Sequence, residues 1–196
     1  MKKLFVAVLI VLFGTQSFSQ DLNKGLKAYN AGDYATALKE WKPLAEEGNA
    51  RAQHNLGVMY QLGRGFLEDA TEAVKWYRLS AEQGYAEAQY NLGNMYRKGN
   101  GVLKDYTEVL KWWRLSAEQG NTYAQHNLGV MYQQGKGVLQ DNVTAHMWYD
   151  IALTNGREKA VEWRDKVAGL MTADAIEKAT TMARKCMTTN YKKCGD

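Results

Sequence analysis

Three histidines are the side chains of this 196-residue chain best suited to metal binding or proton transfer. His54 and His126 occupy the same position of a motif that recurs every 36 residues, and they are two copies apart. Helices pack about 10 Å from each other, which places these two rings roughly 20 Å apart. Ligands of one metal need bonds of about 2 Å. Because His146 is predicted on another helix, the histidines indicate no metal site and no cofactor.

Catalysis by other side chains lacks the residue patterns that it needs. No His-x-x-x-His or Cys-x-x-Cys spacing occurs, and no Ser-x-x-Lys motif is present to activate a serine. Paired carboxylates at a shared site do not stand out either. We therefore expect no catalytic residues and a protein that is not an enzyme.

The first 19 residues differ in composition from the rest of the chain. Lys2 and Lys3 precede a ten-residue apolar run that begins at Leu4, and small residues precede a cut expected ahead of Gln20. A bilayer span needs about 20 apolar residues, so this run is too short to cross one. The pattern predicts a cleaved secretory signal peptide over residues 1–19, with a retained N-terminal anchor as the alternative. We expect a periplasmic or secreted protein without membrane contact after cleavage.

The two cysteines, Cys186 and Cys194, lie close together near the C-terminus. The oxidising compartment that an exported chain enters favours a disulfide between them. Closing so short a loop stabilises the fold by about 2–3 kcal/mol on the chain-entropy model. Two independent exposed thiols are the alternative.

The charge of the chain gives no reason to expect nucleic acid as a partner. The formal net charge is +4 and falls to +2 without Lys2 and Lys3, and no run of five or six basic residues occurs. About 177 residues remain after the expected cut, enough for one domain with a substantial core.

The elements that must position any site come from an internal repeat. The stretch AQHNLGVMYQLGRG begins at Ala52 and returns in similar form at Ala88 and Ala124, each time after 36 residues. Each copy predicts two helices joined by a Gly-x-Gly turn. A capping box at the start of the second helix is predicted where a glutamate follows the aspartate by three residues, as in Asp69 and Glu72. A fixed period of this length is typical of a solenoid.

These residues resemble the Sel-one-like repeat family, longer-period relatives of tetratricopeptide repeats, whose pattern is A-x-x-x-L-G-x-x-Y-x-x-G-x-G-V, then D, A-x-x-W and A-x-x-G. The resemblance implies an all-α fold of about ten helices, an α/α solenoid that forms a right-handed superhelix of helix-turn-helix repeats with C-terminal capping helices. It also implies an adaptor or scaffold role, and we expect a monomer. The expected organisation is an N-terminal tetratricopeptide-like repeat over 20–48, three repeats over 49–156, and capping helices with a disulfide tail over 157–196.

One face of each first helix is left free by the repeat pattern. Leu56 and Gly57 face the second helix of their own repeat, and the glycine is expected where a neighbour approaches closely. The opposite face varies between copies and carries aromatic and hydrogen-bonding residues, as recognition surfaces do. In tetratricopeptide relatives this face lines a concave peptide groove. The expected partner-binding residues are Arg51, His54 and Gln61, then Tyr90, Asn94 and Arg97, then Tyr123, His126 and Gln133.

The middle repeat is expected to supply the centre of this surface through Tyr90, Asn94 and Arg97, with Arg97 selecting acidic or C-terminal carboxylate-bearing segments. The leading hypothesis is a protein-interaction module that binds a partner protein or peptide. A solvated face without a ligand is the simplest alternative. Two others are a wall-glycan or peptidoglycan binder, and a β-lactam-binding or β-lactam-hydrolysing enzyme. Cysteine-rich family members of the latter kind carry a disulfide in each repeat, whereas the repeats here contain no cysteine.

Overall fold

The computed structural model describes residues 21–191 and 194, and this part of the chain is all-helical, as predicted. The expected signal peptide over 1–19 lies outside the described residues. No strand occurs in the described part. The ten helices there are α1 (Leu22–Asn30), α2 (Tyr34–Glu46), α3 (Ala50–Gln61), α4 (Ala70–Glu82), α5 (Ala86–Lys98), α6 (Tyr106–Ala117), α7 (Thr122–Gln134), α8 (Asn142–Thr154), α9 (Ala160–Ala168) and α10 (Ala173–Thr188).

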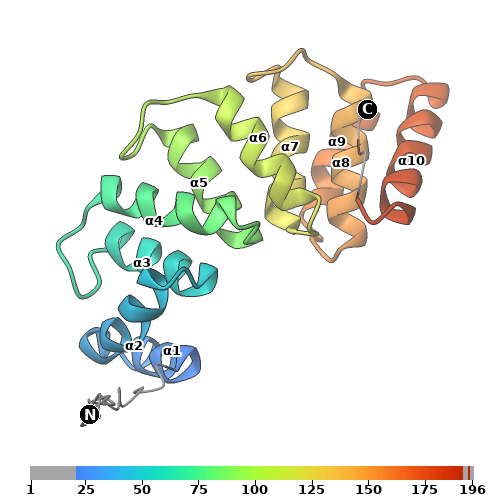
Figure 1. Ribbon diagram of the computed structural model, residues 1–196. Coiled ribbons are helices and arrows are strands. Elements are labelled where there is room, and N and C mark those ends of the chain that lie inside the picture. The colour runs from blue at the N-terminus through green and yellow to red at the C-terminus, as the bar shows by residue number, and fades with distance from the viewer. Residues whose placement is uncertain (1–20, 192–193, 195–196) are drawn as a thin grey trace, which may run out of the picture.

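From α1 to α9, successive helices pack against each other in chain order, and the helices form a curved array (Figure 1). α3 packs on α4, α5 on α6 and α7 on α8 within the repeats, and α4 on α5 and α6 on α7 between them. This arrangement confirms the predicted α/α solenoid. Across the described residues, no helix is long and apolar enough to span a bilayer.

The aspartates that follow each Gly-x-Gly turn cap the second helices. Asp69 Oδ1 accepts from the backbone amides of Thr71 and Glu72, and Asp105 and Asp141 cap α6 and α8 in the same way. The predicted capping box is only half right, because Glu72 does not return a bond to Asp69. The backbone amide of Asp69 donates instead to the carbonyl of Tyr60, at 3.0 Å, so the first helix already satisfies it.

A recurring contact between a glycine and an aromatic ring holds the two helices of each repeat together. A β-carbon at Gly57 would lie 2.6 Å from the ring of Tyr77, well inside van der Waals contact, and Gly129 stands in the same relation to Tyr149. Both rings are fully buried. The close approach predicted at Gly57 is therefore confirmed, and the missing side chain is a packing requirement.

The C-terminal helices cover the last repeat. α8 packs against both α9 and α10, and Ala179, Ala183 and Cys186 of α10 are buried. Cys186 and Cys194 lie at disulfide-bonding distance, with their Cα atoms 4.9 Å apart. α9 and α10 thus form the capping pair predicted for the end of the array.

Candidate functional site

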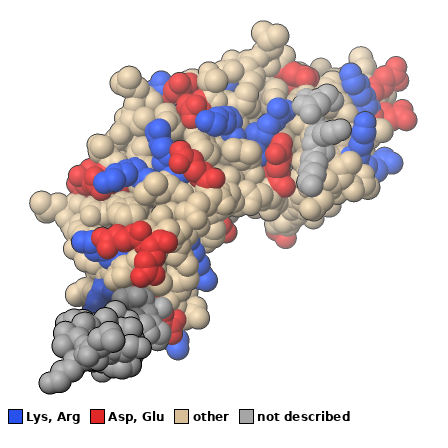
Figure 2. All heavy atoms as spheres, in the orientation of Figure 1, with Lys and Arg blue, Asp and Glu red and all other residues tan. Residues whose placement is uncertain are grey.

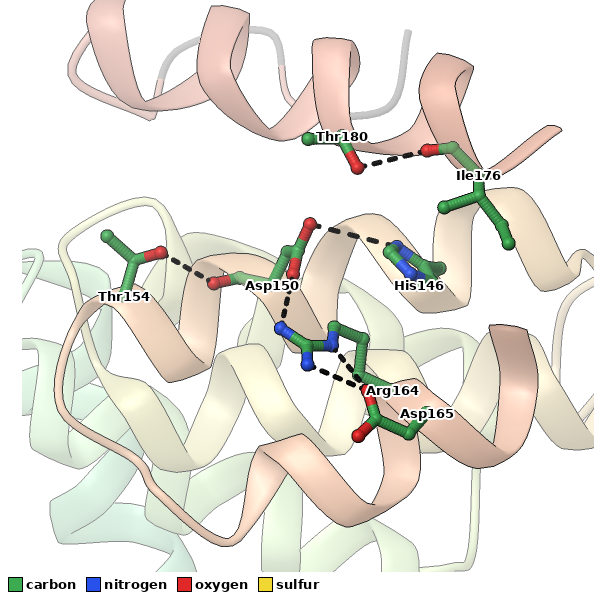
Figure 3. Close-up of polar contacts among 7 residues, drawn as sticks. All are labelled: His146, Asp150, Thr154, Arg164, Asp165, Ile176 and Thr180. Carbon is green, nitrogen blue, oxygen red and sulfur yellow. Dashed lines mark hydrogen bonds and ion pairs between the residues drawn. The ribbon is translucent and has the colours of Figure 1, made fainter. Parts of the chain in front are cut away.

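A polar cluster between α8 and α9 is the arrangement that most resembles catalytic chemistry (Figure 3). His146 Nδ1 on α8 lies 3.8 Å from Asp150 Oδ2, and Arg164 on α9 donates to Asp150 Oδ1 at 3.3 Å. His146 is only 4% exposed. Burial lowers the pKa of His146 although the Asp150 carboxylate opposes this. The imidazole is too deeply buried to meet a substrate, and the cluster serves to join α8 to α9.

The described residues contain no group of three or more histidine, cysteine or acidic side chains that could hold a metal. Lysine and arginine alternate with aspartate and glutamate on the face seen in Figure 2, so that face has no extended patch of one sign.

The expected site position that holds His54, Tyr90 and His126 contacts the core ring of the same repeat. His54 lies 5.7 Å from Tyr77 and His126 lies 5.4 Å from Tyr149, measured between ring centroids. Tyr90 is stacked on Trp113 at 6.3 Å with an interplanar angle of 22°, whereas the two histidine rings are tilted. These side chains therefore support the core as well as the surface, which corrects the expectation that Tyr90 is a free surface anchor.

The two histidines are engaged within the protein. Burial lowers the pKa of His54, and the neutral ring donates from Nδ1 to Asn55 Oδ1 and accepts at Nε2 from Asn91 Nδ2, 3.1 Å away. His126 is only 8% exposed, and burial together with the Arg157 charge lowers its pKa to about 4. His126 also contacts the ring of Trp163. It is not the accessible recognition residue that we expected.

Gln61 and Gln133 are also engaged in the structure. The Tyr77 hydroxyl donates to Gln61 Oε1 at 2.6 Å, and the Tyr149 hydroxyl donates to Gln133 Oε1 at 2.7 Å. Burial raises the pKa of Tyr77 still further above neutral pH, and its protonated hydroxyl is the donor. Each bond joins the first helix to the second helix of its repeat. We expected these glutamines to be free to bind a partner, and this is wrong for their amide oxygens, which already accept a hydrogen bond within the protein.

Two further expected residues lie near the surface. Arg51 is exposed at the start of α3. Tyr123 is 55% exposed, its ring lies 5.9 Å from that of Tyr90, and the guanidinium of Arg157 lies 4.3 Å from its ring centroid. Neither Arg51 nor Tyr123 lines the pocket described next.

The three residues expected at the centre of the surface line one pocket. This α5–α7 pocket has a volume of about 340 Å³ and opens between α5 and α7, with Trp113 of α6 in its wall. Its lining residues are Tyr90, Asn94, Arg97, Tyr106, Trp113, Asn127, Val130, Met131, Gln134 and Lys136. The structure thus brings Tyr90, Asn94 and Arg97 together.

The charges in this pocket are all positive. Arg97 and Lys136 line it, and no aspartate or glutamate does. Within residues 21–191, neither cation forms an ion pair, and the side-chain amides of Asn94 and Asn127 form no hydrogen bond. The pocket therefore offers two cations and two amides that can bind a ligand without breaking an internal contact.

Sequence reasoning missed Trp113, Asn127 and Lys136 as site residues. A signal was present for Trp113 alone, because its position and that of Arg97 change together between copies. The first and third repeats pair a tyrosine with a glutamine, and the middle repeat has Trp113 and Arg97 at the same two positions. This coupled change distinguishes the middle repeat from the other two.

Comparison with known proteins agrees with this repeat architecture. A family model described as Sel1 repeat matches residues 50–85, 86–121 and 122–156. A Sel1 repeat protein from Oxalobacter formigenes has a similar crystal structure, with 34% identity and a TM-score of 0.69 over 71% of this chain and 58% of that one. A protective antigen of uropathogenic Escherichia coli strains, with an SLR fold, is 34% identical with a TM-score of 0.73 over 84% of this chain and 37% of that one. The chain therefore spans less than two-thirds of either protein. No curated protein matches it.

Proposed function

The chain belongs to the Sel1 repeat family, and from this we propose that it is a protein-interaction module that holds a partner segment on the concave face of its solenoid, at the α5–α7 pocket. Sel1 repeat proteins generally mediate protein–protein interaction, and the fold is typically non-catalytic. The partner would be a protein or peptide, bound by a monomer.

The observation that carries this proposal is the pocket itself. Tyr90, Asn94 and Arg97 lie on successive turns of one face of α5, and side chains of α7 form the opposite wall. The lining is about half aromatic or aliphatic and half charged or amide side chains, so the open pocket offers both apolar contact and polar groups to a ligand. Its volume of about 340 Å³ suits one or two side chains of a longer segment that continues along the array.

We further propose that the protein works in the periplasm or outside the cell. The support is the composition of residues 1–19 and the cysteine pair of the C-terminal cap, which an oxidising compartment favours. Fractionation of cells that express the full chain should recover it, shortened at the N-terminus, from the envelope or the medium. Recovery of the full-length chain from the cytoplasm would refute this assignment.

Site-specific photo-crosslinking in the envelope tests the binding site. A benzophenone side chain placed at Asn94, inside the pocket, should form a crosslinked product with a partner protein. The matched control carries the same group at Lys111, an exposed position of α6 that does not line the pocket. Crosslinks that form equally from both positions, or only from Lys111, would move the site away from the pocket.

Two assays address the alternative functions directly. Sedimentation with insoluble peptidoglycan tests wall-glycan binding, and hydrolysis of nitrocefin tests β-lactamase activity. If the proposal is right, the native protein should neither sediment with peptidoglycan nor hydrolyse nitrocefin more than the Arg97→Gln variant does. Either activity, if it depends on pocket residues, would replace the proposal of a protein partner.

A further inference from the structure

We propose that the α5–α7 pocket binds an acidic side chain of an extended peptide segment, with Arg97 and Lys136 sharing its carboxylate. We also infer that the change to Trp113 and Arg97 in the middle repeat is what opens the pocket. This inference rests on the proposed function and specifies the chemistry of the partner.

The flanking repeats show what happens without that change. In the first repeat the Tyr77 hydroxyl bonds to Gln61, and the groove beside it is bridged by the bond between His54 and Asn91. In the third repeat the Tyr149 hydroxyl bonds to Gln133. The residues at these positions are therefore satisfied by their own protein.

The middle repeat lacks the bond between the two helices that the tyrosine and glutamine form in the flanking repeats. Trp113 has no hydroxyl, and its indole Nε1 donates instead to the backbone carbonyl of Tyr90 at 3.2 Å. Arg97 replaces the glutamine and carries no acceptor, so the bond seen in the flanking repeats cannot form. Arg97 is exposed. Asn127, the counterpart of Asn91, likewise has no hydrogen-bond partner for its side chain in the described structure.

The N-terminal groove shows that the positions of Arg97 and Lys136 can meet. When the shorter N-terminal repeat is aligned with the others, Tyr29 of α1 occupies the position of Arg97 on α5. Arg64 occupies the position of Lys136. In that groove the Arg64 guanidinium donates to the Tyr29 hydroxyl and lies 5.1 Å from its ring centroid. The same two positions in the α5–α7 pocket hold two cations. An anion between them is the ligand that removes their repulsion.

The rest of the lining indicates a peptide rather than a free ion. The amides of Asn94 and Asn127 can bond to a peptide backbone, which carries both donors and acceptors. Val130 and Met131 add apolar surface next to the two cations. The expected ligand is therefore a segment in which an aspartate or glutamate neighbours an apolar residue.

The test starts from a library of random decapeptides displayed on phage with blocked C-termini, selected on the mature protein. Selected sequences should be enriched in an acidic residue beside an apolar one. The best peptide, synthesised with a C-terminal amide, is then measured by fluorescence anisotropy beside its Glu→Gln or Asp→Asn analogue. Loss of that one carboxylate should weaken binding at least about tenfold, as expected for a charge-assisted contact.

Variants of the protein locate the contact. Arg97→Gln and Lys136→Gln should each weaken binding of the acidic peptide about tenfold and should have little effect on its neutral analogue. The control is Lys98→Gln, which removes an exposed charge next to Arg97 but outside the pocket lining. The double variant W113Y/R97Q recreates the tyrosine–glutamine pair of the flanking repeats. It should melt like the native protein and bind neither peptide.

The possible failures are distinguishable. Selected peptides that bind in the pocket without any acidic preference would refute the carboxylate inference and leave the proposed function intact. Binding that requires a free C-terminus but no acidic side chain would also refute it. If selection yields no peptide that depends on the pocket, or if peptidoglycan binds through Arg97, both proposals fall. Should W113Y/R97Q not fold, the single Arg97 and Lys136 variants still decide the question.

Discussion

The indole ring of Trp113 occupies the space that a β-carbon at Gly93 would need. Gly93→Leu should therefore force α5 and α6 apart and lower the free energy of unfolding by about 1–3 kcal/mol or more, as overpacking does. Denaturant titration followed by circular dichroism measures this. Gly169→Leu is the control, because a β-carbon there meets only atoms at 3.6 Å or beyond at a negative φ. An unchanged midpoint for the Gly93 variant would contradict the assigned helix face.

The hydrogen bonds between tyrosine and glutamine should make a measurable contribution to stability. Tyr77→Phe removes the bond to Gln61 and keeps the ring, so the free energy of unfolding should fall by about 1 kcal/mol. Tyr149→Phe should behave alike. Tyr90→Phe is the matched control, since in the described structure its hydroxyl donates to no other group. An equal loss of stability in the Tyr77 and Tyr90 variants would show that the hydrogen bond to Gln61 does not account for the effect.

Stability should fall on acidification because His126 is buried in its neutral form. Its pKa is about 4 in the folded protein and 6.5 when unfolded, so between these values only the unfolded chain binds the proton. The loss begins as the pH falls through 6.5, is complete below pH 4, and amounts to about 3 kcal/mol at most. The pKa values of His54 and His146 are lowered as well and act in the same direction.

His126→Phe isolates this contribution. The variant keeps an aromatic ring beside Tyr149 and Trp163 and cannot be protonated. Its melting temperature should fall less than that of the native protein between pH 7 and pH 4. Parallel profiles would show that His126 does not carry the pH dependence.

The cysteine pair should be oxidised in protein recovered from the envelope. Thiol titration in denaturant without reductant should then find no free thiol. Reduction should lower the free energy of unfolding by about 2–3 kcal/mol, because the link restricts the unfolded chain. Two thiols per chain before reduction would contradict the pairing. The Cys186→Ser and Cys194→Ser double variant should melt like the reduced protein whether or not reductant is present.

The sequence was sufficient for the fold because the information is local and repeated. Gly57, Gly93 and Gly129 recur at one position, and the aspartates that begin the second helices recur at another. Each such residue acts within its own repeat, through a close helix contact or a cap, so periodicity alone reveals its role. Even the centre of the candidate site, Tyr90 with Asn94 and Arg97, followed from their shared helix face.

The tertiary structure decided which residues of that face are available. Gln61 and Arg97 occupy equivalent positions, yet Gln61 is engaged by a hydroxyl of the next helix and Arg97 is not. Lys136 joins Arg97 from the neighbouring repeat, 39 residues away in the chain. A helical wheel shows only the faces of one helix. It cannot reveal either relationship, because each one involves a residue outside that helix. The local periodicity therefore determined the array, and the contacts between its helices determined where a ligand can bind.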